Sequence, residues 1–374
     1  MSHPTDCPIC AAIDYNLSNV ENGRRLDVSE MTIRRHKAHK SLDDVDSFFT
    51  DIPNAIITSR GRSILTADGW EKITYSPAKA ALLETLKYDD IERAIENYTF
   101  TPAPPSHRYG SFVLCLADYQ VGKAGEAGGG TPELIARVLA SLSKAVERVK
   151  EEKPCEIILL DLGDGIEGFS NTGSQAQTND IDLTTQIRTF RRLMIEAIKM
   201  FAPLAPNVTY ASVPSNHCQL RAPGGKDLAS TPDNDFGLEV SYQLEDVLEG
   251  RENYSHVRFV RPTGQSEALT LQTVDGTFIG AVHGHQAKSP DKMGEWWKGQ
   301  SHGRRDDLHK ADILLYGHYH SMRVQQSGDS RWLLGAPTSD NGSQWFTNKT
   351  GEQSKSGMLA FTTNSGQWKD LEIL

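Results

Sequence analysis

The pattern of apolar and polar residues changes near residue 111. Beyond it, short apolar runs alternate with longer stretches in which apolar residues recur every three or four positions. Short apolar runs are typical of buried strands, and the longer period is typical of amphipathic helices. The pattern predicts strands at 112–117, 156–160, 208–213, 313–316, 331–334 and 358–362, and helices at 131–150, 183–201 and 236–248.

Turn and cap residues add two further predictions. Asp275 and Gly276 separate the apolar runs 269–274 and 277–282, as in a β-hairpin. Thr131 stands directly before Pro132, which predicts Thr131 as the cap of the helix that follows. Strands that alternate with helices in this way indicate an α/β fold.

The N-terminal region is expected to fold as a small helical head. Residues 11–17 and 28–36 each predict a short helix, joined by a polar turn that contains Gly23, with Ser29 as the cap of the second helix. Two short helices joined by a turn indicate a helix-turn-helix arrangement.

A proline-rich stretch at 101–105 is the clearest linker in the chain. Before it, residues 44–100 predict a strand at 55–66 and helices at 77–85 and 89–97. The predicted domains are therefore a head (1–43), a small α+β segment with its linker (44–105) and a main domain (106–374).

Two residue pairs in the head have the side chains of a zinc site. Cys7 and Cys10 have zinc-ligand spacing, and His36 and His39 would share one face of a helix. One structural zinc ion is one interpretation. A free thiol pair beside a basic helix is the other.

Charge is distributed unevenly. The chain has a formal net charge of −10, which opposes non-specific binding to nucleic acid. Residues 24–40 nevertheless contain six Lys or Arg and only two acidic residues. A solvated helix face and a protein-binding surface are alternatives to nucleic-acid binding. In a helix-turn-helix head, the side chains expected to contact phosphates are Arg34, Arg35, Lys37 and Lys40.

Composition places the chain among soluble globular proteins. It has 374 residues, 38% of them hydrophobic and 24% charged, and its apolar runs are far shorter than a membrane helix requires. No basic stretch followed by an apolar core opens the sequence, and the five cysteines are an odd number. We therefore expect a cytoplasmic protein without a disulfide framework and without a membrane partner.

Residues that can bind metal ions follow five of the predicted strands. The carboxyl ends of strands in an α/β sheet meet at one edge, so these residues are expected to form one site. A single Asp or His of this kind is more often structural, and the metal hypothesis depends on the whole set. The motifs are Asp118-Tyr119-Gln120, Gly163-Asp164, Asn216-His217, His283-Gly284-His285 and Gly317-His318-Tyr319-His320.

This order of motifs resembles the calcineurin-like metallophosphoesterase superfamily, over roughly residues 111–363. Within it, the chain looks most like the SbcD-type and double-strand-break-repair nuclease-like proteins of phages. The resemblance implies a four-layer α/β/β/α sandwich of two mixed sheets. It also implies two divalent metal ions, with manganese favoured and magnesium, iron or zinc as alternatives.

The resemblance also implies a role for each residue. Asp164 would bridge the two ions, and His217 would protonate the leaving oxygen or stabilise the transition state. His285 would lie behind the metal ligands. One ion would be completed by Asp118, Gln120 and His320, the other by Asn216, His283 and His318, and the catalytic set would be His217, Asp164 and Asn216.

Three residues depart from the family pattern. Gln120 replaces a histidine, so a hard oxygen replaces a nitrogen, which favours Mn²⁺ or Mg²⁺ and weakens that position. Cys218 replaces an acid after the catalytic histidine, and a thiol is a poor acceptor for orienting His217. Ser215 replaces a glycine, which is a mild change.

The leading hypothesis is a metal-dependent phosphodiesterase that cleaves nucleic acid, as an endonuclease or exonuclease. Hydroxide on the metal pair would attack the phosphodiester in line, and the basic head would supply the DNA affinity that the acidic body lacks. One alternative is a phosphoesterase of small molecules or phosphoproteins, which the net charge favours. Another is a catalytically inactive DNA-binding protein. The resemblance to family nucleases also leaves a homodimer open.

Trp296 and Trp297 are expected in a loop that also carries lysines. The pair could stack on bases, or it could pack the loop onto the domain, which is the more common role of such a pair. The lysines are Lys288, Lys292 and Lys298.

Overall fold

The computed structural model describes residues 12, 18–29, 32, 62–66, 69–73, 95–96, 98–104, 110–124, 129–169, 179–222, 226–228, 232–340 and 354–374. The chain divides into two units, Met1–Ser59 and Arg60–Leu374. No helix within the described ranges is long and apolar enough to cross a membrane.

The head contains a helix that differs from the prediction. Helix α2 spans Asn19–Leu26 and begins with a capping box between Ser18 and Glu21. It ends at Asp27, whose backbone is left-handed. Gly23 therefore lies inside a helix, and the predicted turn around it is wrong. The capping signals at both ends outweigh the low helix propensity of one glycine.

The second helix of the head is described only in part. The hydroxyl of Ser29 accepts a hydrogen bond from the Thr32 amide at 3.1 Å, the contact that an N-cap makes. The residues of the zinc and phosphate-contact hypotheses lie outside the described residues, and both stay predictions. They are Cys7, Cys10, His36 and His39, and Arg34, Arg35, Lys37 and Lys40.

The main domain contains two mixed sheets. The six-stranded sheet has the order β15-β14-β3-β4-β5-β8, with β3, β4, β5 and β8 parallel and β14 and β15 antiparallel. Its strands are β3 (Ser111–Leu116), β4 (Glu156–Asp161), β5 (Val208–Ser212), β8 (Val257–Val260), β14 (Leu359–Asn364) and β15 (Gln367–Ile373).

The five-stranded sheet has the order β12-β13-β11-β10-β9. Strands β9 and β10 form the predicted antiparallel hairpin, and β10, β11 and β13 are parallel. Its strands are β9 (Ala268–Gln272), β10 (Phe278–Val282), β11 (Ile313–Tyr316), β12 (Arg323–Ser327) and β13 (Arg331–Gly335).

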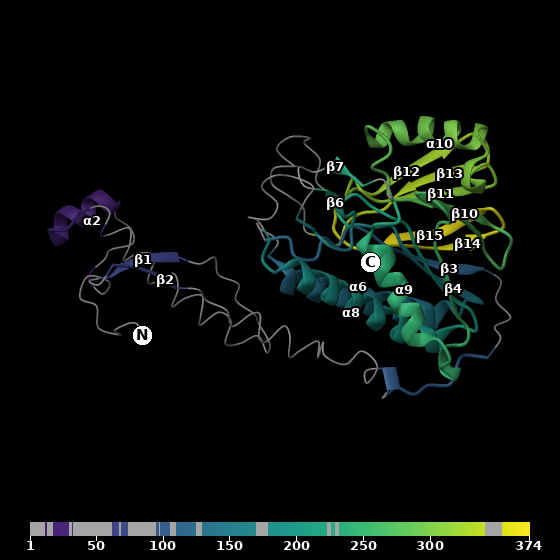
Figure 1. Ribbon diagram of the computed structural model, residues 1–374, viewed down its shortest axis with the longest axis horizontal. Coiled ribbons are helices and arrows are strands. Elements are labelled where there is room, and N and C mark those ends of the chain that lie inside the picture. The colour runs from purple at the N-terminus through teal and green to yellow at the C-terminus, as the bar shows by residue number, and fades with distance from the viewer. Residues whose placement is uncertain are drawn as a thin grey trace. The chain divides into compact units, whose positions relative to one another are not determined.

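An apolar core joins the two sheets face to face. Alternate residues of β3 and β4, such as Val113 and Ile158, pack against Ile279, Leu315 and Leu334 of the other sheet. Helices α6 (Thr131–Glu152), α8 (Leu183–Phe201) and α9 (Phe236–Leu248) lie on the outer side of the six-stranded sheet, and α10 (Met293–His302) lies on the outer side of the five-stranded sheet (Figure 1). The predicted four-layer sandwich is confirmed.

Small elements complete the described chain. The remaining strands and 3-10 helices are β1 (Arg62–Thr66) paired with β2 (Gly69–Ile73), β6 (Arg221–Ala222) paired with β7 (Lys226–Asp227), and η1 (Ala202–Leu204), η2 (Glu252–Tyr254), η3 (Pro290–Lys292) and η4 (Arg305–Asp307).

Two local predictions in the main domain are wrong. Gly130, not Thr131, is the N-cap of α6. The Thr131 hydroxyl instead accepts from the Gly122 amide at 3.0 Å and donates to Asp180 at 2.8 Å. The expected tryptophan loop is helix α10, and Trp297 is buried with its indole N–H donating to the carbonyl of Leu308 at 3.0 Å. Trp297 is therefore a core residue and cannot stack on a base.

Candidate metal centre

All five motifs lie just beyond the carboxyl ends of strands. Asp118, Asp164 and Asn216 follow β3, β4 and β5 of the six-stranded sheet. His283 and His318 follow β10 and β11 of the five-stranded sheet. The site therefore lies along the seam between the two sheets, and each sheet supplies part of it.

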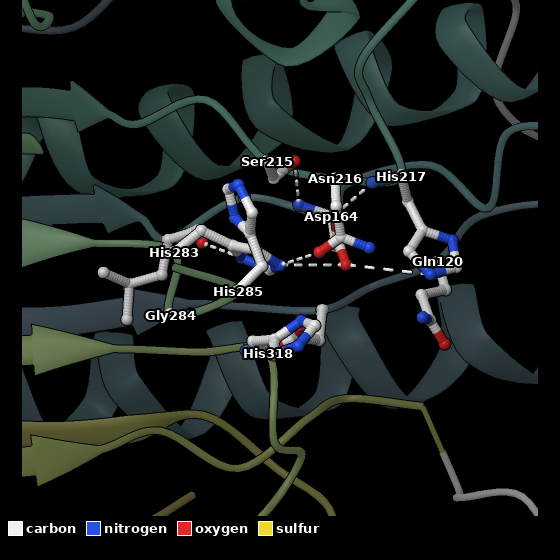
Figure 2. Close-up of polar contacts among 12 residues, drawn as sticks. Gln120, Asp164, Ser215, Asn216, His217, His283, Gly284, His285 and His318 are labelled. Carbon is white, nitrogen blue, oxygen red and sulfur yellow. Dashed lines mark hydrogen bonds and ion pairs between the residues drawn. The ribbon is translucent and has the colours of Figure 1, made fainter. Parts of the chain in front are cut away.

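Asp164 lies at the centre of the site. His283 and His285 lie on one side of it, and His217 and Gln120 on the other (Figure 2). Its Oδ2 is 3.0 Å from Nε2 of His283, and its Oδ1 accepts a hydrogen bond from the His217 amide at 2.8 Å. A carboxylate held in this way keeps one oxygen directed at the facing histidine.

The imidazole of His283 is oriented by the backbone. Its Nδ1 lies 2.7 Å from the carbonyl oxygen of Leu162, which can only accept, so Nδ1 carries the proton of that hydrogen bond. Nε2 then faces Oδ2 of Asp164 at 3.0 Å and Oδ1 of Asn216 at 2.9 Å. An outer hydrogen bond that frees the inner nitrogen is how proteins orient metal-binding histidines.

His318 completes a group of three ligands. One ligand atom from each of Asp164, His283 and His318 lies within 4.8 Å of the others. Within the described part of the chain, no other group of three or more His, Cys, Asp or Glu side chains meets this condition. We call Asp164, Asn216, His283 and His318 the principal position.

Asp118, Gln120 and His320 form a second position beside it. Oδ1 of Asp118 is 3.4 Å from Nε2 of His320, and Oδ2 accepts the His318 amide at 2.9 Å. The amide of Gln120 donates to the Asp164 carbonyl at 2.8 Å. The two positions are thus joined through the backbone as well as through the site itself.

Electrostatics show that the principal position is built around a positive charge. Burial alone would raise the pKa of Asp164, but the charges of His283 and His217 hold it well below its usual range. Burial lowers the pKa of His283, yet the Asp164 carboxylate more than offsets it and raises this pKa to about 9. Burial, together with His283, lowers the pKa of His318 to about 4, which leaves it neutral and able to ligate. A divalent cation fits these donors and their charge.

The backbone of the site is unusual in a second way. Left-handed conformations are uncommon for residues other than glycine and cost free energy, and they cluster at functional sites. Five of the seven residues of the two positions adopt one. They are Asp118 (φ 52°), Gln120 (φ 46°), Asp164 (φ 53°), His318 (φ 68°) and His320 (φ 55°).

His217 is held by a residue that sequence reasoning missed. Its Nδ1 lies 2.8 Å from the carbonyl oxygen of Glu167 and 3.5 Å from the carboxylate Oε2 of the same residue. Its Nε2 faces the site, 4.0 Å from Oδ2 of Asp164. Cys218 is buried and its thiol pKa is raised by burial, so Glu167 stands where the family pattern has an acid next to the histidine.

Asp235 positions the loop that carries Asn216 and His217. Its Oδ2 accepts the Ser215 amide at 2.8 Å, and its Oδ1 accepts the amides of Gly237 and Leu238 at the start of α9. Burial raises the pKa of Asp235 to about 7. Nothing in the local sequence marks Asp235 or Glu167, because both act on residues of other loops.

Ser215 and Gly163 fit against each other beneath Asp164. The Ser215 hydroxyl accepts the Asp164 amide at 2.8 Å. A Cβ on Gly163 would come within 2.4 Å of the Ser215 Cβ, and Gly163 has φ +91°, so only glycine fits here.

His285 lies at the margin of the site. Its Nε2 is 3.7 Å from Glu267, and its ring centroid is 5.5 Å from that of His283. Burial, together with His283, lowers its pKa to about 3. His283, and not His285, is therefore the histidine that faces Asp164.

Comparisons with known proteins add little to this geometry. No family model and no curated protein matches the chain. Among solved structures, a predicted phosphoesterase from Streptococcus pneumoniae TIGR4 is 11% identical, with a TM-score of 0.29 over 68% of this chain and 84% of that one. Vps29 from Entamoeba histolytica complexed with Zn²⁺ is 12% identical, with a TM-score of 0.32 over 70% and 98%. A putative 5'-nucleotidase from Staphylococcus aureus is 9% identical, with a TM-score of 0.28 over 71% and 53%. Scores of this size do not establish a relationship, so the function is argued from the site.

Proposed function

We propose that this protein is a divalent-metal-dependent phosphoesterase that hydrolyses phosphodiesters of nucleic acid. The observation that carries the proposal is the convergence of Asp164, His283 and His318, with the inward face of His217 beside them. Carboxylate, imidazole and amide donors at a strand edge are what a metal-assisted hydrolysis of phosphate esters requires.

The side chains have separable tasks. Divalent ions, when bound, would supply Lewis acidity and an activated water. Asp164, Asn216, His283 and His318 would hold the principal ion, and Asp118, Gln120 and His320 offer ligands beside it. The Glu167 carbonyl fixes the proton on Nδ1 of His217, so Nε2 is the atom that gives a proton to the leaving oxygen.

The choice of nucleic acid rests on the head. Residues 24–40 are strongly basic, whereas the whole chain carries a net charge of −10. A basic segment on an acidic protein gives the polyanion a local address. A small phosphate ester needs no such segment, and the net charge favours it as the second candidate substrate.

Cleavage assays test the reaction and the substrate separately. End-labelled single- and double-stranded DNA and bis(p-nitrophenyl) phosphate would be incubated with Mn²⁺ and wild-type protein, His217→Ala, or His302→Ala. His302 is exposed at the end of α10 and serves as the control. We expect cleavage by the wild type and His302→Ala, and a loss of about 10²- to 10⁴-fold in His217→Ala.

A charge-removal variant separates the two substrates. Replacing Arg34, Arg35, Lys37 and Lys40 by alanine in the full chain should weaken DNA cleavage and leave hydrolysis of the small diester unchanged. Equal activity of this variant on DNA would favour the small-molecule candidate. Absence of hydrolysis of every substrate with Mn²⁺ would contradict the proposed function.

A further inference from the structure

We propose that Lys123 supplies the positive charge of the second position, so that the protein holds one divalent ion tightly, at the principal position. This inference rests on the proposed function and concerns how the same site is charged. It replaces a symmetric pair of ions by one ion and one fixed ammonium group.

The ammonium of Lys123 lies on a ligand of the second position. Its Nζ donates to Oε1 of Gln120 at 3.1 Å and also forms an ion pair with Asp340. The Lys123 amide donates to the Gln120 carbonyl at 3.0 Å, so a tight turn fixes the spacing between the two residues. The side chain of Lys123 is 24% exposed and that of Asp340 is 13% exposed, which places the pair at the mouth of the site.

The partner of Lys123 is itself anchored to the site. The Asp340 amide donates to the Thr338 hydroxyl at 2.8 Å, and this hydroxyl donates to the backbone carbonyl of Asp118 at 2.6 Å. Lys123 is thus held between two residues, Gln120 and Asp340, that are both tied to Asp118 or its neighbours. This arrangement sets the position of the ammonium group relative to the Asp118 carboxylate.

An ion at the second position would compete with this ammonium. Gln120 offers a single ligand atom, Oε1, because its amide nitrogen has no lone pair to donate. A cation on that oxygen would lie against the Lys123 charge, and like charges repel most strongly where water is partly excluded. Without Gln120, the second position keeps only Asp118 and His320 of its own, whereas the principal position has four donors.

The charge balance agrees with one ion. Asp118 and Asp164 are both fully buried, and Lys123 and Asp340 neutralise each other. One divalent cation would therefore neutralise the two inner carboxylates. A second would leave an excess positive charge beside a fixed ammonium group.

Metal stoichiometry of the full-length protein tests the inference. Protein dialysed against micromolar Mn²⁺ would be measured by plasma mass spectrometry for metal content and by electron paramagnetic resonance for spin coupling. We expect one isolated Mn²⁺ per chain in the wild type and in Lys123→Arg. We expect two coupled ions in Lys123→Met, with affinity for the second raised about tenfold or more.

Two further variants protect this interpretation. Lys123→Met combined with Asp340→Asn removes the whole ion pair, so a second ion gained there cannot be bound by a newly freed Asp340. Lys150→Met, at an exposed lysine paired with Glu147 on α6, is the control and should keep one ion. Circular dichroism establishes that each variant is folded.

The outcomes separate this inference from the proposed function. Two coupled ions in the wild type, or one ion in folded Lys123→Met and in the double variant, would overturn the role of Lys123. In that case Mn²⁺-dependent hydrolysis by the wild type would still support the proposed function. Wild-type protein that binds no Mn²⁺ and hydrolyses nothing would overturn both.

Discussion

Glu167 contacts the imidazole of His217 twice, with its backbone carbonyl at 2.8 Å and its carboxylate at 3.5 Å from Nδ1. The carbonyl is present whatever the side chain at 167. The carboxylate is the part that stabilises a positive charge on the ring during proton transfer.

Substitution of Glu167 should therefore slow the reaction less than loss of His217. We expect Glu167→Gln to lower kcat about tenfold with little change in KM, and His217→Ala to lower it about 10²- to 10⁴-fold. Steady-state kinetics on the small diester at saturating Mn²⁺ measure both. If Glu167→Gln also loses bound metal, Glu167 supports the fold of the site and not the orientation of His217.

Asp235 should make the protein less stable as pH rises. Its folded pKa of about 7 lies above the usual aspartate value, so the folded state binds more protons than the unfolded state between roughly pH 4 and 7. The free energy of unfolding then falls by about 1.4 kcal/mol per pH unit for this group. Asp161, also raised to about 7 by burial, acts in the same direction.

Urea unfolding in EDTA from pH 4.5 to 6.5 checks this prediction. The raised pKa of His283 acts between its usual value and about 9, so it contributes little in this range. Asp235→Asn keeps an acceptor oxygen for the α9 cap but cannot titrate, and its slope should be shallower by the share of one proton. An unchanged slope would show that Asp235 is already ionised at low pH.

Metal binding should release a proton. His283 has a pKa of about 9 without metal, so it is protonated at pH 7, and a ligand must be deprotonated. Titration calorimetry with Mn²⁺ in two buffers of different ionisation enthalpy should give about one proton released per ion at pH 7, declining above pH 9. Binding without proton release would mean that His283 does not ligate the ion.

The left-handed backbone at Gln120 predicts an inverted order of stability. At most positions alanine is at least as favourable as glycine, but at a φ of 46° a Cβ is unfavourable. Gln120→Gly should therefore unfold with a free energy about 1 kcal/mol higher than Gln120→Ala. Both variants lose the same ligand and the same contact with Lys123, so urea unfolding of this pair isolates the backbone. Equal stability would argue against the left-handed conformation.

The sequence was sufficient for elements with buried faces. Strands β3, β4 and β5 and helices α8 and α9 were predicted to within a residue or two, because their apolar residues have a clear period. Strands β12 and β15 were not predicted, since each lies at a sheet edge and is largely exposed or half-buried. An exposed edge strand needs no apolar alternation, so it leaves no pattern to read.

The same limit applies to the site. Asp164 and His283 could be identified because each stands directly after a strand, and strand ends converge. Lys123, Glu167 and Asp235 could not, because their roles depend on hydrogen bonds between loops that are far apart in the chain. Local pattern shows what a strand end carries, but not which other loop reaches it.

The seam between the two sheets gives the principal position a further consequence. Asp164 and Asn216 come from the six-stranded sheet, and His283 and His318 come from the five-stranded sheet. An ion bound there would be a cross-link between the two halves of the sandwich. Release of the ion and separation of the sheets at this edge would then be one coupled motion, so the residence time of the metal would report how often the sandwich opens.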